Sequence, residues 1–340
     1  MIKERTGWLM AGLAVLLLII AVYSATVGTA DIPFNEVVLI TLNELPLINR
    51  YVSAPEGPSR TIVVLIRLPR IVLGIIAGIS LSVSGTSMQG IFKNPMASPF
   101  ILGVSAGGGL GAAIGFYLGV SFYYLPLLAF LTALGTVFLV FALGRVRKKT
   151  DIATLLLAGL AMNFLMSGLT SYIRYMSPPE KMVQMQILSF MLGNLNEAAW
   201  NQVYITLPIM IIGLALVFAY SRDLNVIQMG EESALQLGVD VERTKFVQLV
   251  TSSLLAATMV AFTGIIGFVG LMIPHGARLI VGPEHKRLIP TAALIGGIFL
   301  ILCDTISRTI GEIPVGIITV LLGSPFFIYL LIRNRGDTGW

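Results

Sequence analysis

Long apolar runs without charged residues are the feature of this 340-residue chain that most restricts its fold. Most of them reach the roughly 20 residues that an α-helix needs to cross the hydrocarbon core of a bilayer. Only 11% of the residues are charged, less than half the roughly 25% of an average soluble domain. The chain is therefore expected to be a multi-pass membrane protein that forms one transmembrane domain over residues 1–340, and not a set of soluble domains.

The uncharged runs predict the positions of the spanning helices. They are Thr6–Ala30, Ile71–Phe92, Asn94–Gly144, Ile152–Ile173, Ala198–Ser221, Phe246–Ala277, Leu288–Cys303 and Ile313–Ile332. The run Asn94–Gly144 is twice the length of a span and is interrupted around Gly119–Pro126, which predicts two helices joined by a tight turn. The shorter segment Met182–Asn196 predicts an interfacial or re-entrant helix. For the first run a cleaved signal peptide is the alternative, but its apolar stretch is longer than a typical signal sequence, which favours a retained helix.

Charge at the flanks of Phe246–Ala277 decides how often this run crosses the membrane. The basic residues around it are Arg222, Arg243 and Lys245 before it and Lys286 and Arg287 after it. Basic loops favour the cytoplasm, so the run must cross an even number of times. The glycine-rich stretch Thr263–Gly270 supplies the reversal. The result is an expected bundle of about ten helices with both termini cytoplasmic, in which the cytoplasmic side carries 15 Lys and Arg with 9 Asp and Glu, against 7 and 8 outside.

Two further patterns concern packing and loops. Glycines recur every fourth residue, which places one stripe without side chains along a helix that a neighbour can approach closely. The stripe consists of Gly103, Gly107, Gly111, Gly115 and Gly119. Packing within the chain is the favoured interpretation, and a dimer interface is the alternative. The basic cluster from Arg145 to Lys149 is expected to be a cytoplasmic loop and not a nucleic-acid site.

A polar insert, at about residues 228–245, predicts a rigid knob on the cytoplasmic side. Glu231 and Glu232 suit the positive N-terminal end of a short helix, and Gly238 can end that helix in a left-handed cap. Asp240 can cap a second short helix. The apolar side of the first helix consists of Ala234, Leu235 and Leu237. These residues alone indicate a structured loop, and docking of a partner is the functional alternative.

On the outer side, Arg67 and Arg70 lie one helical turn apart, and Arg308 follows Asp304 by four residues. One interpretation is anchoring at the membrane interface, with Asp304 and Arg308 as an ion pair along one helix. The functional interpretation is an outward-facing cationic patch for acidic groups of a protein that docks there.

Several classes of function are disfavoured by what the sequence lacks. It has no GxxxxGK[ST] phosphate-binding loop, no catalytic constellation around His275 or His285, and a single cysteine, Cys303, so neither a catalytic nor a metal site is expected. The helix centres carry almost no acids, which disfavours an ion-coupled secondary transporter. An intramembrane enzyme would need a polar cluster at one depth, and none is evident.

The stretch Arg67–Ala113 resembles the signature of the FecCD family of ABC-importer permeases for iron-siderophores, haem and cobalamin. Gly267–Pro290, Asp304–Arg308 and Glu312–Leu331 resemble the same family in the same order, so the likeness spans nearly the whole chain. It implies an all-α permease subunit of about ten helices in the cell membrane. The implied partners are a second copy of the chain, two cytoplasmic ATP-binding subunits and an extracytoplasmic substrate-binding protein, with no nucleic acid. ATP and magnesium would be held by the ATP-binding subunits, so this chain would carry no cofactor and be no enzyme.

The resemblance also implies roles for particular residues. Contact with the ATPase, through coupling helices, is implied for Glu231, Glu232, Ala234, Leu235 and Gly238, and docking of the binding protein for Arg67, Arg70 and Arg308. A cytoplasmic gate is implied for Asn94, Pro95, Met96, Ile152 and Ala153. Ile152 and Ala153 replace small polar residues of some relatives, which weakens the expectation of a hydrogen-bonded gate.

The substrate expected from the resemblance is a metal chelate. An oxyanion such as molybdate, carried on the same scaffold, is the alternative. Methionines and tyrosines gather near the outer end of the fifth helix around Arg174, where haem contact and ordinary interfacial packing are both open interpretations.

Overall fold

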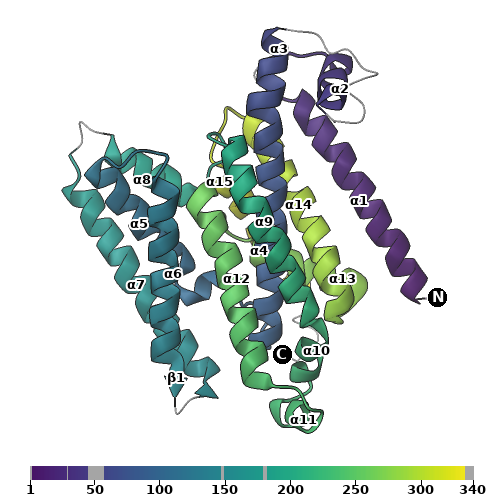
Figure 1. Ribbon diagram of the computed structural model, residues 1–340, viewed down its shortest axis with the longest axis vertical. Coiled ribbons are helices and arrows are strands. Elements are labelled where there is room, and N and C mark those ends of the chain that lie inside the picture. The colour runs from purple at the N-terminus through teal and green to yellow at the C-terminus, as the bar shows by residue number, and fades with distance from the viewer. Residues whose placement is uncertain (1, 29, 45–56, 147–148, 179–181, 334–340) are drawn as a thin grey trace.

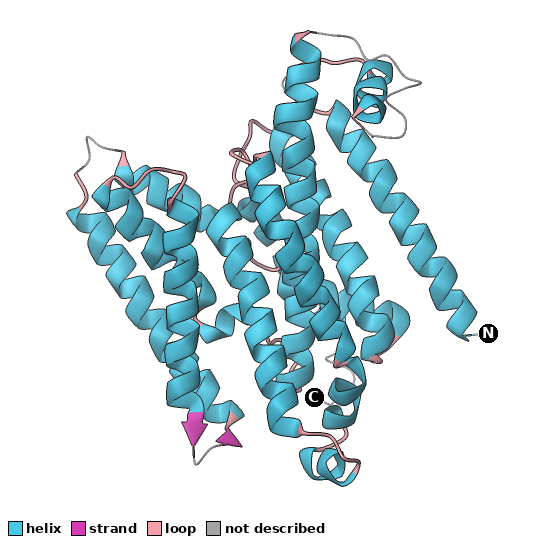
Figure 2. Ribbon diagram, viewed as in Figure 1, coloured by secondary structure: helices cyan, strands magenta, loops and turns pink. Residues whose placement is uncertain are grey.

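The computed structural model describes residues 2–28, 30–44, 57–146, 149–178 and 182–333. The described chain is almost entirely helical, and its long helices run side by side in one bundle (Figures 1 and 2). The long helices are α1 (Ile2–Thr26), α4 (Leu68–Phe92), α6 (Leu125–Gly144), α7 (Ile152–Met176), α9 (Trp200–Ala219), α12 (Val241–Thr263), α14 (His285–Thr309) and α15 (Val315–Arg333). The shorter helices are α2 (Phe34–Asn43), α3 (Pro58–Thr61), η1 (Ile62–Arg67), η2 (Pro99–Leu102), α5 (Val104–Leu118), α8 (Val183–Leu192), α10 (Ser221–Gln228), α11 (Glu231–Gln236) and α13 (Val269–Val281).

Seven helices of the described chain are long and apolar enough to cross a membrane. The predicted breaks are confirmed: α5 ends at Leu118 before α6 begins at Leu125, and α12 ends at Thr263 before α13 begins at Val269. With the shorter α5 and α13 and the C-terminal α15, these helices give the arrangement of about ten that the sequence predicts. α13 has 13 residues, about 20 Å of helix, which is less than the roughly 30 Å of a hydrocarbon core.

Helix α4 is the centre of the bundle. It packs against α9, α12, α13 and α14, and nearly all of its residues from Pro69 to Phe92 are buried. Small residues make this possible: a Cβ at Gly78 would collide with the backbone of Gly296 in α14, and one at Gly85 with the backbone of Gly270 in α13. Close backbone approach between small residues is how membrane helices gain packing energy in lipid.

The N-terminal continuation of α4 is a π-helical segment, η1, which accommodates Pro69. In this segment the backbone N–H of Leu68 bonds to Val63 O, five residues earlier. Pro69 has no N–H, so the next carbonyl, Val64 O, has no partner within the helix. The indole Nε1 of Trp200, at the start of α9, donates to Val64 O at 2.8 Å. The proline therefore creates an acceptor that attaches α9 to this end of the long helix.

The glycine stripe packs α5 against α6, as the favoured interpretation predicted. Cβ atoms added at Gly107, Gly111 and Gly115 would meet Thr136, Thr132 and Leu125 of α6. The two ends of the stripe have another role. Gly103 has φ +83° and precedes α5, and Gly119 has φ +70° and follows it, so both take the left-handed conformation that favours glycine.

The segment Met182–Asn196 forms α8 and a following loop, as predicted for a short helix that does not span. Its end is bonded to the break between α12 and α13: Asn194 N donates to Thr263 O at 2.7 Å, and Ile265 N donates to Phe190 O at 3.1 Å. These bonds give partners to backbone groups that the two interrupted segments would otherwise leave unpaired.

The described residues of the basic cluster lie in two short strands between α6 and α7. Strands β1 (Arg145–Val146) and β2 (Lys149–Thr150) pair antiparallel, which is a small exception to the all-helical prediction. Arg147 and Lys148 lie outside the described residues. In Figure 1 strand β1 lies at the same end of the bundle as α11, and α3 lies at the opposite end.

Replacement of the stripe glycine Gly111 tests the α5–α6 contact. In Gly111→Ala the new Cβ would lie 2.7 Å from Leu128 O and 2.8 Å from Ala129 Cα, so we expect a loss of about 1–3 kcal/mol from overpacking. The matched control is Gly135→Ala in α6, where nothing lies within 4 Å of the added Cβ. Denaturation in mixed detergent micelles should show a lower midpoint for Gly111→Ala alone. Equal midpoints for the two variants would contradict the packing assigned to the stripe.

Candidate functional sites at the two ends of the bundle

The polar insert forms a compact knob at the α11 end of the bundle (Figure 1). Its short helix α11 folds against α10, which precedes the insert, and against the start of α12, around a small core of Ile227, Ala234 and Val241. Ala234 is completely buried in this core. The expectation that Ala234 faces a partner is therefore wrong, because the small side chain is used to hold α11 against α10 and α12.

The outer surface of the knob carries large apolar side chains. Leu235 is 62% exposed, and Leu237 and Met229 are exposed to a similar degree. α11 ends as predicted: Gly238 has φ +79°, its N–H bonds to Leu235 O at 3.0 Å, and the N–H of Val239 bonds to Ala234 O at 3.0 Å. These bonds form a left-handed helix end that keeps Leu235 and Leu237 in fixed positions.

Asp240 caps a helix, but not the second short helix that was predicted. Its Oδ1 accepts a hydrogen bond at 3.0 Å from the backbone N–H of Arg243, at the start of the long α12. The knob is therefore continuous with a membrane-spanning helix, because α12 runs without a break from this cap into the apolar sequence that begins at Phe246.

The two glutamates of α11 have different surroundings. Glu232 is exposed, whereas Glu231 forms an ion pair with Lys245 of α12 at 2.8 Å. Lys245 is only 3% exposed, although its place in the sequence indicates only one of the basic charges of a cytoplasmic loop. The sequence does hold a signal for this buried lysine. Lys245 lies in the second turn of a helix that continues with mostly apolar residues, and a glutamate that can pair with it, Glu231, lies 14 residues earlier.

At the α3 end, a buried carboxylate joins α4 and α14. Asp304 Oδ1 accepts from Arg70 Nε at 2.8 Å and lies 2.8 Å from a terminal guanidinium nitrogen of Arg70. Arg308 Nε lies 3.2 Å from Asp304 Oδ2, close enough for an ion pair although not aligned as a hydrogen bond. The predicted pairing of Asp304 with Arg308 along one helix is confirmed.

Arg308 and a further arginine, Arg67, bind the carbonyl groups at the end of α1. Arg67 donates to Ala25 O at 2.7 Å and to Ala30 O at 2.5 Å. Arg308 donates to Val27 O at 2.8 Å and to the hydroxyl and carbonyl of Ser24. The last carbonyls of a helix lack partners within it and carry partial negative charge, so they favour cations.

The expectation of an outward-facing cationic patch is wrong for this conformation of the chain. Arg67, Arg70 and Arg308 are 4%, 5% and 6% exposed. The physical reason is that Asp304 and the carbonyls at the end of α1 satisfy the guanidinium groups inside the bundle, and a buried charge is stable only with such partners. Docking of a binding protein at this end stays a prediction that the geometry does not test.

The predicted gate residues lie in the turn after α4 and at the start of α7. Asn94 closes the turn, since its Oδ1 accepts from Met96 N at 2.8 Å and its carbonyl accepts from Ala97 N at 3.0 Å, and Pro95 lies within it. Met96 is 45% exposed.

At the start of α7, Ile152 packs against the core and Ala153 is exposed. Their neighbour Asp151 caps the helix by accepting bonds from the hydroxyl and backbone N–H of Thr154, at 2.5 and 2.8 Å, which lowers the pKa of its carboxyl group. The hydrogen bonding of this segment is therefore local.

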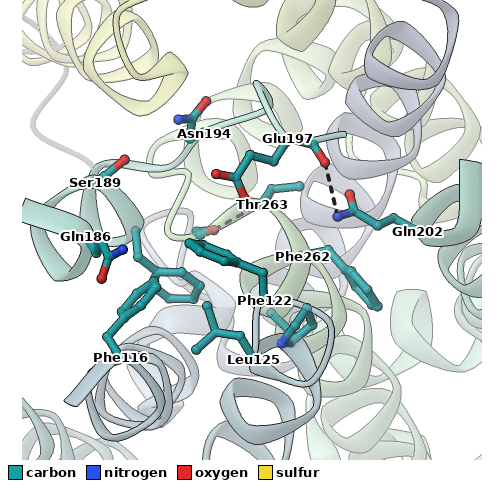
Figure 3. Close-up of a pocket in the computed structure, with 14 residues that line it drawn as sticks. Phe116, Phe122, Leu125, Gln186, Ser189, Asn194, Glu197, Gln202, Phe262 and Thr263 are labelled. Atoms are coloured by element: carbon teal, nitrogen blue, oxygen red, sulfur yellow. Dashed lines mark hydrogen bonds between the residues drawn. The ribbon is translucent and has the colours of Figure 1, made fainter. Parts of the chain in front are cut away.

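A cavity of about 250 Å³ lies where α5, α6, α8, α9 and α12 meet toward the α3 end (Figure 3). Aromatic rings of Phe116, Phe122 and Phe262 form one part of its wall, and the polar side chains of Gln186 and Asn194 another. No pattern in the sequence indicates this cavity, because its lining comes from five separate helices and the loops beside them. Nearby on α7 and α8, the large side chains of the methionine and tyrosine cluster are exposed; they are Tyr172, Tyr175, Met176, Met182, Met185 and Met191.

Comparisons with known proteins agree with this architecture. The chain is 40% identical to the cobalamin import system permease protein BtuC of Halobacterium salinarum, over 96% of this chain and 95% of the relative. It is 30% identical to the molybdate import system permease protein MolB of Haemophilus influenzae, over 95% of both chains.

A solved structure described as an inward-facing conformation of a metal-chelate type ABC transporter superposes with a TM-score of 0.85. It shares 29% sequence identity, and the match covers 96% of this chain and 99% of the other. The model of the FecCD transport family matches residues 16–333. The chain therefore belongs to the FecCD family of ABC-importer permeases.

Proposed function

We propose that this permease imports a metal chelate, such as an iron-siderophore, haem or cobalamin, across the cell membrane into the cytoplasm. The observation that carries the proposal is a rigid knob with exposed apolar side chains, continuous with α12, on a bundle that resembles a metal-chelate transporter along its whole length. The relative named as a cobalamin permease supports this class of substrate.

The chain is proposed to act as a homodimer with two ATP-binding subunits and one extracytoplasmic binding protein. ATP and magnesium would be held by the ATP-binding subunits, because this sequence contains no phosphate-binding loop. In this scheme, closure of those subunits pushes the knob, and the two permease halves rock so that a path between them opens alternately to each side.

The α11 end is proposed to face the cytoplasm, with both termini on that side. The excess of basic residues on the loops of this end supports the assignment, since cytoplasmic loops of membrane proteins are enriched in Lys and Arg. The cytoplasmic gate is then proposed at the turn Asn94–Met96 and at Ile152 and Ala153, whose positions at the α11 end fit that role.

Contact with the ATPase is proposed for Leu235, with Glu232 beside it. Glu231, through its ion pair with Lys245, and Gly238, at the helix end, are proposed to hold α11 in place for this contact. Exposed apolar side chains on a rigid element are typical anchors of protein interfaces. Ala234 supports the knob from inside.

For the extracytoplasmic side, we propose that Arg67, Arg70 and Arg308 build the platform on which the binding protein docks. They join α1, α4 and α14 at that end through the buried contacts described above.

Molybdate or a related oxyanion is the second candidate substrate, favoured by the likeness to a molybdate permease at 30% identity. A screen of metal chelates and oxyanions against the cognate binding protein distinguishes the two classes. Tight binding of molybdate and of no chelate would overturn the proposed substrate class while leaving the permease assignment intact.

Cysteine labelling tests the orientation. In a Cys303→Ser background, a membrane-impermeant maleimide added to intact cells should label Ser121→Cys, in the exposed loop between α5 and α6, and leave Glu284→Cys unlabelled. Permeabilisation should expose Glu284→Cys. Labelling of Glu284→Cys in intact cells would contradict both the sidedness and the reversal between α12 and α13.

Replacement of Leu235 by aspartate tests the proposed ATPase contact. A charge placed where the partner's pocket is apolar should weaken capture of the ATP-binding subunit by about tenfold or more. Gln236→Asp, which adds the same charge at the next exposed position of α11, is the matched control. Binding is measured with purified subunits and permease in nanodiscs. If Leu235→Asp captures the subunit as well as Gln236→Asp does, the knob is only a loop.

Substitution of two arginines at the α3 end tests whether Arg70 supports the docking surface from inside or contacts the binding protein itself. Arg70→Met leaves a buried carboxylate short of one partner and should cost about 3 kcal/mol or more of stability. Arg60→Met breaks the exposed pair with Glu44, which is 2.8 Å long, and should cost about 0–1 kcal/mol. Unfolding free energy and affinity for the binding protein are measured together. A loss of affinity in Arg70→Met at unchanged stability would show that the arginine contacts the binding protein directly.

A further inference from the structure

Lys245 is a buried cation that belongs to the knob and to a membrane-spanning helix at once. Its ammonium group lies 2.8 Å from each carboxylate oxygen of Glu231 in α11 and 3.8 Å from Glu242, one turn earlier in α12. The lysine is 3% exposed, whereas the side chain of Glu231 is 41% exposed. The lysine is thus enclosed by the fold, and the carboxylates that face it, Glu231 at 2.8 Å and Glu242 at 3.8 Å, are both partly exposed.

The contact matters because α11 has little else to fix it. α11 has six residues, too few for a helix to be stable alone. It lies between two glycines with positive φ, Gly230 at +133° and Gly238 at +79°, where the chain can change direction. Besides the small Ala234 core, the Glu231–Lys245 pair joins α11 to α12 through side chains.

The same face of α12 continues into the bundle as a buried polar path. Gln248, three residues after Lys245, accepts from Ser87 of α4 at 2.5 Å and donates to Val217 O of α9 at 3.1 Å. One turn further, Ser252 O accepts from Ser84 of α4 at 2.7 Å. Because of these hydrogen bonds, a displacement of the start of α12 would also displace the central helix α4 and α9.

We propose that the Glu231–Lys245 ion pair is a positioning contact that makes the knob and α12 move as one body, so that force on α11 reaches α4 and α9 through Gln248 and Ser252. This inference rests on the proposed function, because it assumes that an ATP-binding subunit acts on the knob. It goes beyond that function by naming the bond that transmits the motion, a role distinct from surface contact with the subunit. A coupling path requires an element that both sites bias, and the joined knob and α12 would be that element.

The test separates binding of the ATP-binding subunit from transmission of its motion. The permease, with Cys303→Ser and the single reporter Asn201→Cys at the exposed start of α9, is reconstituted in nanodiscs with the ATP-binding subunit. Affinity for the subunit, the rate of ATP hydrolysis, and the maleimide labelling rate of the reporter with and without magnesium-ATP are measured. The probe is ATP itself, so no transported substrate is needed.

We expect Glu231→Ala to bind the subunit within about twofold of the parent, while the ATP-dependent change in labelling rate falls at least fivefold. The matched control is Glu284→Ala, which removes a glutamate from a surface pair with Arg287, 3.0 Å long, elsewhere at the α11 end. The reversed pair, Glu231→Lys with Lys245→Glu, should regain part of the response. Lys245→Met removes the other partner of the pair and should show the same loss of response. If this buried substitution prevents folding, the test rests on Glu231→Ala, because Glu231 is partly exposed and its removal leaves the core unchanged.

Three results would overturn the inference. The first is an ATP response of Glu231→Ala equal to that of Glu284→Ala. The second is a parallel loss of subunit affinity and response, which would make the pair a matter of local stability only. The third is failure of the parent permease to bind the subunit or to respond to ATP, which would overturn the proposed function itself and the inference with it.

Discussion

Close backbone approach around α4 is the constraint on which the rest of this bundle depends. Within lipid there is little hydrophobic gain from bringing two helices together, so packing and polar bonds must hold them. Gly78 and Gly85 let α14 and α13 approach until backbones touch, and serines on the same helix bond to α12. The central helix thereby joins most of the bundle and leaves the outer faces of α1, α6 and α7 for the membrane.

The two ends of the bundle use ion pairs in different ways. At the α3 end, Asp304, Arg70 and Arg308 are all almost fully buried, and their charges are compensated inside the protein. Such clusters stabilise little in net terms but are costly to break, so they fix the register of α1, α4 and α14. At the α11 end, Lys245 is buried and its partner Glu231 is half in solvent, so the pair joins a surface element to the interior.

Between these ends the connection is short. α12 begins in the knob and then forms hydrogen bonds to α4 and α9. It ends at Thr263, whose carbonyl accepts a hydrogen bond from the loop after α8. One helix thus links the surface proposed for the ATPase with the aromatic and polar cavity near the other end. In the proposed scheme the energy for import comes from a partner subunit, and α12 is the continuous element that would carry its motion along the bundle.

The sequence by itself determined the membrane class, the helix count, the reversals at Gly119–Pro126 and Thr263–Gly270, and the family, because apolar length, glycine placement and motif order are local properties of the chain. Only the tertiary structure decided which way the charged and small side chains of the two ends face. Arg67 and Arg70 share a helical face in the sequence, but whether that face meets solvent or the carbonyls of α1 depends on a helix more than 35 positions away. Ala234 and Lys245 likewise became interior residues only when α11 folded onto α12. Spacing along one helix fixes a face, and the partner that covers it comes from elsewhere in the chain.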